Sequence, residues 1–537
     1  EAGEVKAECE KDNQKGVNER KKLQSNTKYV FRAKAVNSKG AASDFSDCCT
    51  RILKSGISQS EVVVSHFSGN DTACEKNDPS DPNQKKEKCK TIHNALKFNE
   101  FENVNLKLHP GVYNAHPKGG KAIIFKRNGM GMAGTGDSWK TTWPESTVAR
   151  NTEAVVNCNT RSCIDIDFVQ KLYAPSHLQQ LTFTNASTKT DFYGDRSKGS
   201  DIHKHGGAVI RLVGQQDPLF KGIEIKNCIF EMNTAKGEGG VIFADCSEHT
   251  FTLTFQDVLF RQNHVDSKRG GGALRVHKCS TKMERVKFDS NTAINGGGGA
   301  ARFSLGSLKI TDQLVAINNV AGGRDGGGAF RLNGTALNME DKNNVCHGNV
   351  VTHQFGSGGA CLYAEYATLD IRGWNISSNI AETFGGAIRC MGSKLNVRNS
   401  IFSRNTAKKE GGSISGMLCN SKFIGSTFSH NTAGIHDDAR NGVGYGGAIS
   451  LGPGSGAEIR SSSFVRNEAN AGGGAFCCDA CDRNVVLFNT SFLSNHARVG
   501  GAVFLYETKI MLRALGPAQF LEQFTSIVIN DTLPSTF

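Results

Sequence analysis

The chain has 537 residues, including 61 glycines, 10 prolines and 3 tryptophans, and its net charge is +12. Much glycine with little proline excludes a collagen or a disordered linker and favours a fold with many tight, repeated turns. No apolar run reaches the roughly 18 residues of a membrane-spanning helix, and the polar start EAGEVKAECEKDNQKG is not a signal peptide. The positive charge is spread thinly and is not interleaved with aromatics, so nucleic acid is not an expected partner.

Residues 23–46 alternate between apolar and polar side chains, which predicts β-strands. The segment resembles the closing half of a fibronectin type III domain. Leu23, Thr27 and Tyr29 match its tyrosine corner, and Asn37 and Gly40 match its hairpin turn. Because such a domain needs seven strands, we expect residues 1–55 to be its C-terminal part and the chain to be a piece of a longer polypeptide.

Residues 56–180 are expected to hold a cap and irregular early coils. A short helix is predicted from residue 90 to residue 96, followed by a strand over 104–108 and a turn at 110–113. This order resembles the N-terminal cap of pectin-lyase-like β-helices, which closes an otherwise open strand edge. We predict two local disulfides, Cys74–Cys89 and Cys158–Cys163, because each pair is close in sequence.

Residues 181–505 repeat one phrase about eleven times. Its elements are an apolar residue, two variable ones, an asparagine, a short polar loop, Gly-Gly-Ala and an alternating apolar strand. The unit contains two or three short strands and no helical period, which predicts a right-handed parallel β-helix, an all-β fold. The repeated asparagines, 26 to 36 residues apart, are Asn233, Asn263, Asn291, Asn319, Asn349, Asn379, Asn405, Asn431, Asn467 and Asn495.

Each repeated residue has an expected structural role. The asparagines should bond from coil to coil as a ladder, and they tolerate the left-handed backbone region. The Gly-Gly pair should allow positive φ and close backbone approach, and the following alanine should fit a narrow interior. The apolar position should stack as an aromatic column made of Phe230, Phe260, Phe288, Phe402, Phe428, Phe464 and Phe492.

The paired motifs resemble those of the polymorphic outer-membrane-protein adhesins. They read FEMN, FRQN, FDSN, FSRN, FSHN, FVRN and FLSN, each followed by forms of GGA[ILVF]. The resemblance covers roughly 325 residues and implies a surface-displayed β-helix used in adhesion. Residues 506–537, where the repeat has stopped, are expected to cap or link.

We find little sign of catalytic chemistry. Pectin-lyase-like folds host lyases, hydrolases and esterases, which need carboxylates that converge on one face. Here Asp and Glu occupy positions that differ from coil to coil, and no G-x-S-x-G, P-loop or H-E-x-x-H motif occurs. We therefore expect no catalytic residue, no metal, no cofactor and no enzyme activity.

Cysteines and glycosylation sequons favour the secretory pathway and an extracellular or cell-surface location. The 17 cysteines lack zinc-site spacing, and their odd number implies a free thiol or a bond to another chain. Cys246 and Cys279 follow their Gly-Gly pairs at similar distances, which allows either a disulfide between coils or buried thiols. The sequons are at Asn70, Asn185, Asn333, Asn375, Asn489 and Asn530.

Two coils carry long insertions between the asparagine and the Gly-Gly pair, spanning 21 residues after Asn185 and 15 after Asn431. Identical coil geometry places both on one edge, and insertions on one face often mark a binding face. The alternative is that they are tolerated surface loops. The candidate contacts to a partner are Tyr193, His203, His205, His436, Arg440 and Tyr445.

The expected function is a non-enzymatic, structural or adhesive β-helix within a larger glycosylated surface or filament protein. Its partners would be other protein chains or surface glycans, with self-assembly possible in principle. The alternative is a carbohydrate-active enzyme or a polysaccharide-binding protein of the pectin-lyase-like class.

Overall fold

The computed structural model describes the chain in segments, and every regular element assigned in them is a β-strand. The described residues are 28–30, 50–52, 60–64, 92, 104–109, 111–115, 123–127, 131–134, 154–158, 163–170, 176–188, 207–212, 222–247, 250–354, 358–434, 444–506, 520–521 and 527–530. Two compact units divide the chain: residues 1–60 with 101–103, and residues 61–100 with 104–537.

The first unit contains one described pair of strands. β1 (Lys28–Val30) runs antiparallel to β2 (Thr50–Ile52), and Tyr29 lies opposite Arg51. The other residues that carry the fibronectin resemblance lie outside the described residues, so that resemblance stays a prediction.

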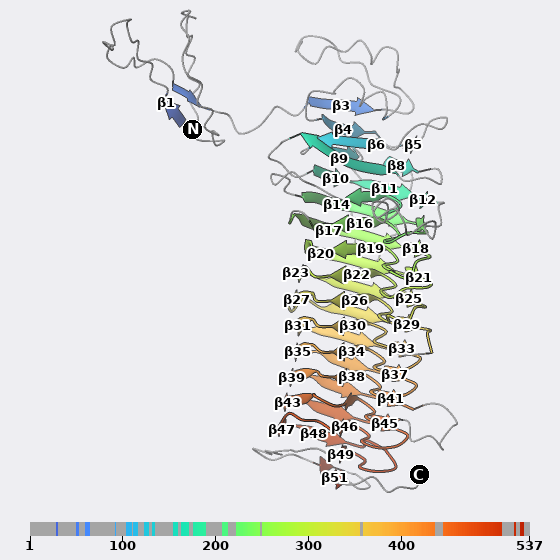
Figure 1. The fold of residues 1–537 in the computed structure, drawn as a ribbon, viewed down its shortest axis with the longest axis vertical. Helices are drawn as coiled ribbons and strands as arrows, with labels where there is room; N and C mark the ends of the chain where they lie inside the picture. The colour runs from blue at the N-terminus through green and yellow to red at the C-terminus, as the bar shows by residue number, and fades with distance from the viewer. Residues whose placement is uncertain are drawn as a thin grey trace, which may run out of the picture. The chain divides into compact units, whose positions relative to one another are not determined.

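The second unit is a parallel β-solenoid of about eleven turns, which confirms the predicted fold class. In one representative coil, β22 (Ala301–Ser304) leads to β23 (Ser307–Ile310), β24 (Leu314–Ile317) and β25 (Val320–Ala321), and each pairs in parallel with its equivalent in the next coil. The equivalent strands form three sheets, which we call sheet I (25 strands), sheet II (14 strands) and sheet III (10 strands) (Figure 1).

Sheet II holds the strand that follows each Gly-Gly pair. Its members are β6 (Ile123–Arg127), β9 (Ile164–Gln170), β13 (Ile210–Leu212), β16 (Ile242–Asp245), β19 (Leu274–His277), β22, β26 (Phe330–Asn333), β30 (Leu362–Glu365), β34 (Ile388–Met391), β38 (Ile414–Met417), β42 (Ile449–Leu451), β46 (Phe476–Asp479), β49 (Val503–Tyr506) and β51 (Ile527–Asn530).

Sheet III holds the two-residue strands that directly follow the ladder asparagines from Asn233 to Asn467, together with β12 before them. Its members are β12 (Ser187–Thr188), β15 (Thr234–Ala235), β18 (His264–Val265), β21 (Thr292–Ala293), β25, β29 (Val350–Val351), β33 (Ile380–Ala381), β37 (Thr406–Ala407), β41 (Thr432–Ala433) and β45 (Glu468–Ala469).

Sheet I contributes two segments to each coil. In β14 (Gly222–Glu231), β17 (Thr252–Arg261) and β20 (Ser280–Asp289) one strand bends between them, at residues with φ near 50°. Later coils split the segments into pairs: β27 (Ala336–Met339) with β28 (Asn344–His347), β31 (Thr368–Arg372) with β32 (Trp374–Ser377), β35 (Lys394–Arg398) with β36 (Ile401–Ser403), β39 (Asn420–Ile424) with β40 (Thr427–Ser429), β43 (Gly456–Arg460) with β44 (Ser463–Val465), and β47 (Val485–Phe488) with β48 (Ser491–Leu493).

The remaining members of sheet I lie toward the ends of the solenoid. They are β3 (Ser60–Val64), β4 (Val104–Leu108), β5 (Gly111–Asn114), β7 (Gly131–Gly134), β8 (Ala154–Asn157), β10 (Ser176–Gln179), β11 (Leu181–Thr184) and β50 (Phe520–Leu521). β4 has the predicted bounds 104–108. Of the predicted helix at 90–96, only Ile92 is described; it is buried and has α-helical conformation.

The interior is one continuous apolar core with two phenylalanine columns. Rings stack from Phe183 through Phe230 and Phe260 to Phe288, and again from Phe402 through Phe428 and Phe464 to Phe492, with centroids 4.8–5.2 Å apart. The single column expected from sequence is therefore interrupted. The intervening coils place Ala316, Cys346 and Ile376 at this position.

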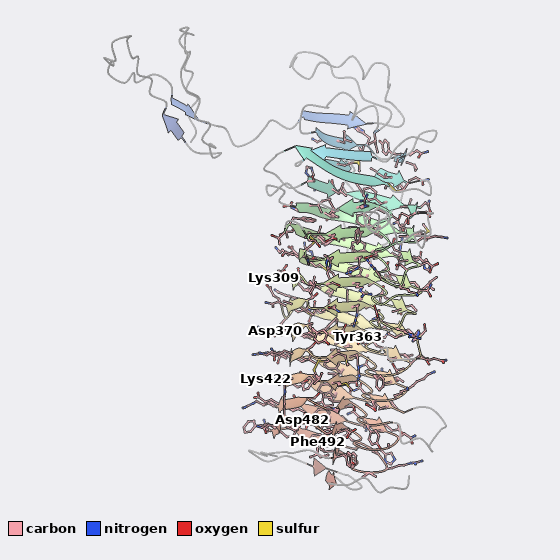
Figure 2. All side chains as sticks on the ribbon, viewed as in Figure 1. Lys309, Tyr363, Asp370, Lys422, Asp482 and Phe492 are labelled. Carbon is pink, nitrogen blue, oxygen red and sulfur yellow. A yellow bond between two sulfur atoms is a disulfide. The ribbon has the colours of Figure 1, made fainter. Side chains whose placement is uncertain are left out.

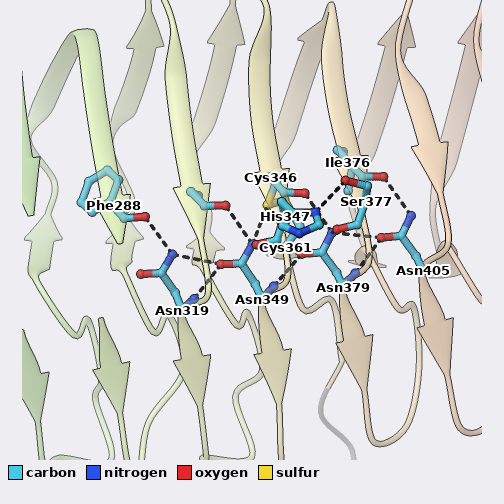
Figure 3. Close-up of a disulfide and its surroundings, with 11 residues drawn as sticks. Phe288, Asn319, Cys346, His347, Asn349, Cys361, Ile376, Ser377, Asn379 and Asn405 are labelled. Atoms are coloured by element: carbon cyan, nitrogen blue, oxygen red, sulfur yellow. Dashed lines mark hydrogen bonds between the residues drawn. A yellow bond between two sulfur atoms is a disulfide. The ribbon is translucent and has the colours of Figure 1, made fainter. Parts of the chain in front are cut away.

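The ten repeated asparagines form one hydrogen-bonded ladder at the turn before sheet III. Within the ladder, Asn349 donates from both its backbone N and its Nδ2 to Asn379 Oδ1, each at 3.0 Å (Figure 3). Asn379 repeats the pattern toward Asn405, at 3.1 and 2.9 Å. Each asparagine from Asn263 onward also donates to a carbonyl of the preceding coil, as Asn379 does to Cys346 O at 3.0 Å. The backbone N–H and the side-chain amide of Asn349 and of Asn379 are thus both hydrogen-bonded inside the protein.

We expected the ladder asparagine to adopt the left-handed backbone conformation. Instead, the residue before it does. Ser378 precedes Asn379 and has φ 54°, and Arg404 precedes Asn405 and also has φ 54°. The backbone N–H and the side chain of the asparagine must both point along the solenoid axis, toward the asparagine of the next coil. The preceding position therefore turns the chain, and it accepts varied residues because its side chain is not needed for the ladder.

Glycine is required twice at the turn into sheet II. Gly271 has φ 80°, which side-chain-bearing residues rarely adopt. A Cβ on the following Gly272 would collide with the carbonyl oxygen of Gly299 in the next coil. The third residue of the motif, Ala273, is fully buried. These observations match the roles assigned to Gly-Gly-Ala.

Five disulfides are described, and only two of them belong to pairs named from sequence. Cys158–Cys163 is formed, and Cys246–Cys279 resolves the open alternative as a bond between neighbouring coils. Cys74 and Cys89 lie outside the described residues. The unforeseen pairs are Cys346–Cys361, Cys390–Cys419 and Cys478–Cys481, while the free thiols in the described chain are the buried Cys228 and Cys477.

Candidate functional site

The outer face of sheet II carries a row of arginines, which we call the arginine row: Arg275, Arg302, Arg331 and Arg389. These four positions and Tyr363 stand in register on five successive strands, in the order 275, 302, 331, 363, 389. Their strand neighbours on both sides face the core, so alternation directs the row outward. Tyr363 lies over the face of sheet II, whereas Lys309, Asp370 and Lys422 lie along the neighbouring edge formed by sheet I (Figure 2).

Carboxylates converge on this row. Glu238 pairs with Arg275 at 3.1 Å, Asp325 with Arg302 at 2.6 Å, and Glu365 with Arg331 at 2.5 Å. Glu238 and Asp325 each stand directly before a glycine in the turn from sheet III to sheet II, and Glu365 ends β30. Acidic residues scattered in sequence therefore meet on one face, which corrects our expectation that they do not.

The arginine row is largely withdrawn from water. Arg275, Arg331 and Arg389 are 8%, 4% and 7% exposed. Burial lowers the pKa of all three guanidinium groups, that of Arg275 to about 10. The guanidinium of Arg331 stacks 3.8 Å from the Tyr363 ring centroid, and that of Arg389 lies 4.4 Å from the Phe384 centroid.

Beyond Arg389 the row changes to small residues around an acid. Ser415, Ser450 and Cys477 follow Arg389 in register and are buried. Arg389 donates through Nη1 to Ser415 Oγ. Glu410, from the turn that precedes β38, is partly buried and accepts a hydrogen bond from Ser450. We call Arg389, Glu410, Ser415, Ser450 and Asp479 the Glu410 cluster.

The carboxyl group of Glu410 is biased toward its protonated form. Burial is the main cause that raises its pKa, and the negative charge of Asp479 raises it further, while Arg389 opposes the shift. Asp479 ends β46 and is exposed. Glu410 is partly buried, and the exposed Asp479 lies two coils along the same face. Enzymes use two carboxyl groups in unlike settings as a proton donor and a second, ionised group.

Both insertions adjoin the edge of this face. The first leaves the chain after Thr188 of β12 and returns at Gly207 before β13. The second leaves after Gly434, which follows β41, and returns at Gly444, before Tyr445 bridges to Glu410. Both thus leave from sheet III and re-enter toward sheet II.

Of the candidate contacts to a partner, only Tyr445 lies among the described residues. Its ring stacks on Phe504 at 6.0 Å, and burial raises the pKa of its hydroxyl. Tyr445 therefore packs against the face instead of projecting from it. The candidates outside the described residues are Tyr193, His203, His205, His436 and Arg440.

The sequons differ in their setting. Asn185 and Asn375 are exposed. Asn333 donates to Glu365 at 2.9 Å, and Asn489 donates to Ser461 at 3.5 Å. Asn70 is outside the described residues, and Asn530 is described only as part of β51.

No protein-family model matches the chain, and no curated protein matches it. Among solved structures, it is similar to a lacto-N-biosidase of glycoside hydrolase family 136 from Eubacterium ramulus, with 10% identity and a TM-score of 0.19, over 88% of this chain and 68% of that one. The expectation that the chain is not an enzyme is withdrawn. At this TM-score no residue role is carried over.

Two further observations limit the site in the described part of the chain. No group of three His, Cys, Asp or Glu side chains is placed there to hold a metal ion. No described helix is long and apolar enough to cross a membrane.

The disulfides indicate a non-cytosolic protein.

The arginine row had a signal in the sequence that we missed. Arginine stands two residues after the motif alanine in GGALR, GAAR, GGAFR and GGAIR. A residue that recurs at an outward position of a solenoid forms a row, as the asparagines do at an inward one. The carboxylates gave no comparable signal, because they come from different parts of the coil.

Proposed function

We propose that this chain is an extracellular carbohydrate-active protein that binds a glycan along sheet II and acts on it at the Glu410 cluster. The observation that carries the proposal is the setting of Glu410: a partly buried carboxyl with a raised pKa, close to a second carboxylate and to Arg389. General acids in glycoside hydrolysis have a raised carboxyl pKa, which is the direction of the shift at Glu410.

The face around the cluster suits a sugar chain. The partly exposed carboxyl groups of Glu365 and Glu410 can bond to sugar hydroxyls, and the partly exposed Phe384 adds flat apolar surface. The buried Arg331 and Arg389 hold Glu365 and Phe384 in place. Positions recur along the face at the strand spacing of about 4.8 Å, which provides a series of subsites for an extended polymer. In this proposal the glycosidic C–O bond breaks as Glu410 protonates the leaving oxygen, a water molecule forms the new bond to the anomeric carbon, and the Asp479 carboxylate accepts a proton from that water.

The test uses the full chain against a panel of neutral and acidic oligosaccharides, measuring release of reducing ends. Glu410→Gln should reduce turnover at least a hundredfold and leave ligand binding within threefold, because the amide keeps the shape but cannot donate the proton. Asp370→Asn is the matched control, since Asp370 pairs with Arg372 on sheet I. Equal turnover by Glu410→Gln and wild type, or neither binding nor turnover by wild type, would refute the proposal.

A second role, adhesion at a cell surface, is supported by the repeated FxxN and GGA motifs and their resemblance to adhesin repeats. We propose it as compatible with glycan binding, because an adhesin can bind through the same face. Binding of the labelled chain to glycan-bearing cells, and its loss after enzymatic removal of the glycans, tests this role. Undiminished binding after that removal would contradict it.

A further inference from the structure

One corner of the solenoid carries large apolar side chains at positions where the backbone suits glycine. From β19 to β46, the turn between sheet II and the first segment of sheet I places one residue with positive φ in each coil. In successive coils this residue is Leu305, Gly334, Tyr366, Gly392 and Leu418, with φ of 57°, 56°, 50°, 55° and 53°. Large residues and glycines therefore alternate at one backbone conformation.

This choice is unusual within the molecule. Twenty-three non-glycine residues in the described chain have positive φ, and nearly all are polar. Only four carry a large apolar or aromatic side chain, namely Met232, Leu305, Tyr366 and Leu418. Because the left-handed region disfavours residues with a Cβ, and because the alternate coils use glycine, the three corner residues are not required by the turn.

These side chains are also exposed. Leu305 and Leu418 are 53% exposed and Tyr366 is 70% exposed, and the adjacent Met417 is 38% exposed. Each large side chain leans over the glycine of the following coil. A Cβ at Gly334 would lie 2.7 Å from Leu305 Cδ2, and one at Gly392 would lie 2.8 Å from the Tyr366 ring. The glycines thus leave room for an apolar ridge, which we call the corner ridge (Leu305, Tyr366 and Leu418).

The dimensions of the corner ridge favour a narrow, repeating ligand. Its members recur every second coil, or about every 9.6 Å, and together span about 19 Å. A single line of side chains is too narrow for the roughly 800 Å² per partner of an ordinary protein interface. A regular polymer, in contrast, presents the same chemical group at each member of the ridge.

The neighbouring column selects the chemistry of that polymer. The first positions of the sheet I strands beside the ridge are in register and mostly small and uncharged: Ser280, Ser307, Ala336, Thr368, Lys394 and Asn420. Apolar surface beside hydroxyl and amide groups fits pyranose rings, which have apolar C–H faces and hydroxyl edges. One lysine in the column gives little attraction for a polyanion.

We propose that the corner ridge is a second binding surface, which holds an extended neutral polysaccharide. It lies on a different corner from the Glu410 cluster and goes beyond the proposed function, with which it shares only the class of ligand. A protein with both surfaces would hold a polymer on the ridge while the sheet II face engages another part of it.

The test is binding of the full chain to microcrystalline cellulose and to chitin, with soluble alginate as an acidic probe. The triple variant Leu305→Gly, Tyr366→Gly, Leu418→Gly should bind the neutral polymers at least tenfold more weakly. Glycine suits this backbone, so the thermal unfolding midpoint should stay within a few degrees of wild type. Met232→Gly, which removes an exposed apolar residue of similar φ at another corner, is the matched control and should bind as wild type.

Several results would overturn the proposal. They are the absence of wild-type binding to both neutral polymers, equal binding by the triple variant, or an equal loss with Met232→Gly. Loss of self-association in the triple variant, measured by sedimentation velocity, would instead assign the ridge to a second copy of the chain. Glu410→Gln should leave ridge binding intact, and the triple variant should keep turnover of short oligosaccharides, so failure of one proposal is distinguishable from failure of the other.

Discussion

Removing one rung of the asparagine ladder should cost far more than an ordinary asparagine substitution. In Asn379→Ala, the backbone N–H of Asn349 loses its acceptor, and the carbonyl of Cys346 loses its side-chain donor (Figure 3). The Asn349 side chain keeps its bond to Ala316 O at 3.0 Å, and Asn405 Oδ1 keeps the backbone N–H of residue 379 at 3.1 Å. The Cys346 carbonyl belongs to the β28–β32 ladder, so one buried group, the Asn349 backbone N–H, is left without its acceptor.

The unpaired N–H costs about 1–3 kcal/mol and the lost side-chain hydrogen bonds add about 1 kcal/mol, so the substitution should destabilise the chain by about 3 kcal/mol. Asn379→Asp keeps the acceptor but directs an oxygen at Cys346 O and Asn405 Oδ1. It should therefore destabilise at least as much at pH 7. Burial should raise the pKa of the new carboxyl, so the defect should lessen as the pH falls and the group binds a proton.

Urea unfolding gives the change in free energy, and hydrogen–deuterium exchange of peptides covering 344–354 reports the Asn349 amide directly. Because solenoids can unfold in parts, the exchange measurement locates the damage. Asn338→Ala, at an exposed position of β27, is the control and should change stability by less than about 0.5 kcal/mol. A loss below about 1 kcal/mol in Asn379→Ala, or an equal loss in the control, would refute the account of the ladder.

Three further predictions concern other parts of the chain. Burial raises the pKa of Glu410 in the folded protein, so its charged form opposes folding, and wild-type stability should fall as the pH rises from the usual glutamate range through the folded pKa. The melting temperature of Glu410→Gln should therefore exceed that of wild type by an amount that grows from pH 4 to pH 7. A constant difference in melting temperature would contradict the pKa shift. Phe428→Ala, in the middle of a stacked column, should cost about 3–5 kcal/mol in urea unfolding, and a cost under about 1 kcal/mol would show that the column is loosely packed. Non-reducing peptide mapping should recover the five described disulfides, with Cys228 and Cys477 alkylated only after unfolding; labelling of either thiol in the native protein would argue against its burial.

The features that the sequence predicted well are those that recur in every coil, namely the asparagine ladder and the Gly-Gly-Ala turn. A single Asn349 would carry no information, but ten asparagines at one position of the repeat indicate a row of identical contacts. The same holds for Ala273 and its preceding glycines, whose close approach to the next coil is a property of backbone geometry alone. Repetition converts a weak local preference into a prediction of the fold.

What the sequence could not predict depends on contacts that occur once. Cys346 and Cys361 are 15 residues apart and join sheet I to the start of a sheet II strand through the interior, which no local spacing indicates. Glu410 and Asp479 lie two coils apart and come from a turn and a strand end, so their proximity requires the turn from sheet III to be placed against sheet II. Phe288 has no aromatic successor because the position passes to Ala316, whose role becomes clear only from register.

The disulfides between coils also bear on how the molecule would respond to pulling. Tension on the chain would peel off one coil at a time, because each coil is held by its neighbour alone, and every coil released would lengthen the path by roughly 95 Å. Cys246–Cys279 and Cys390–Cys419 each tie one coil covalently to the next. When unfolding reaches one of these disulfides, the residues between its two cysteines therefore cannot be stretched. Under load the protein would therefore act as an extensible tether with built-in stops, and reduction of these two bonds would set how far it can be drawn out.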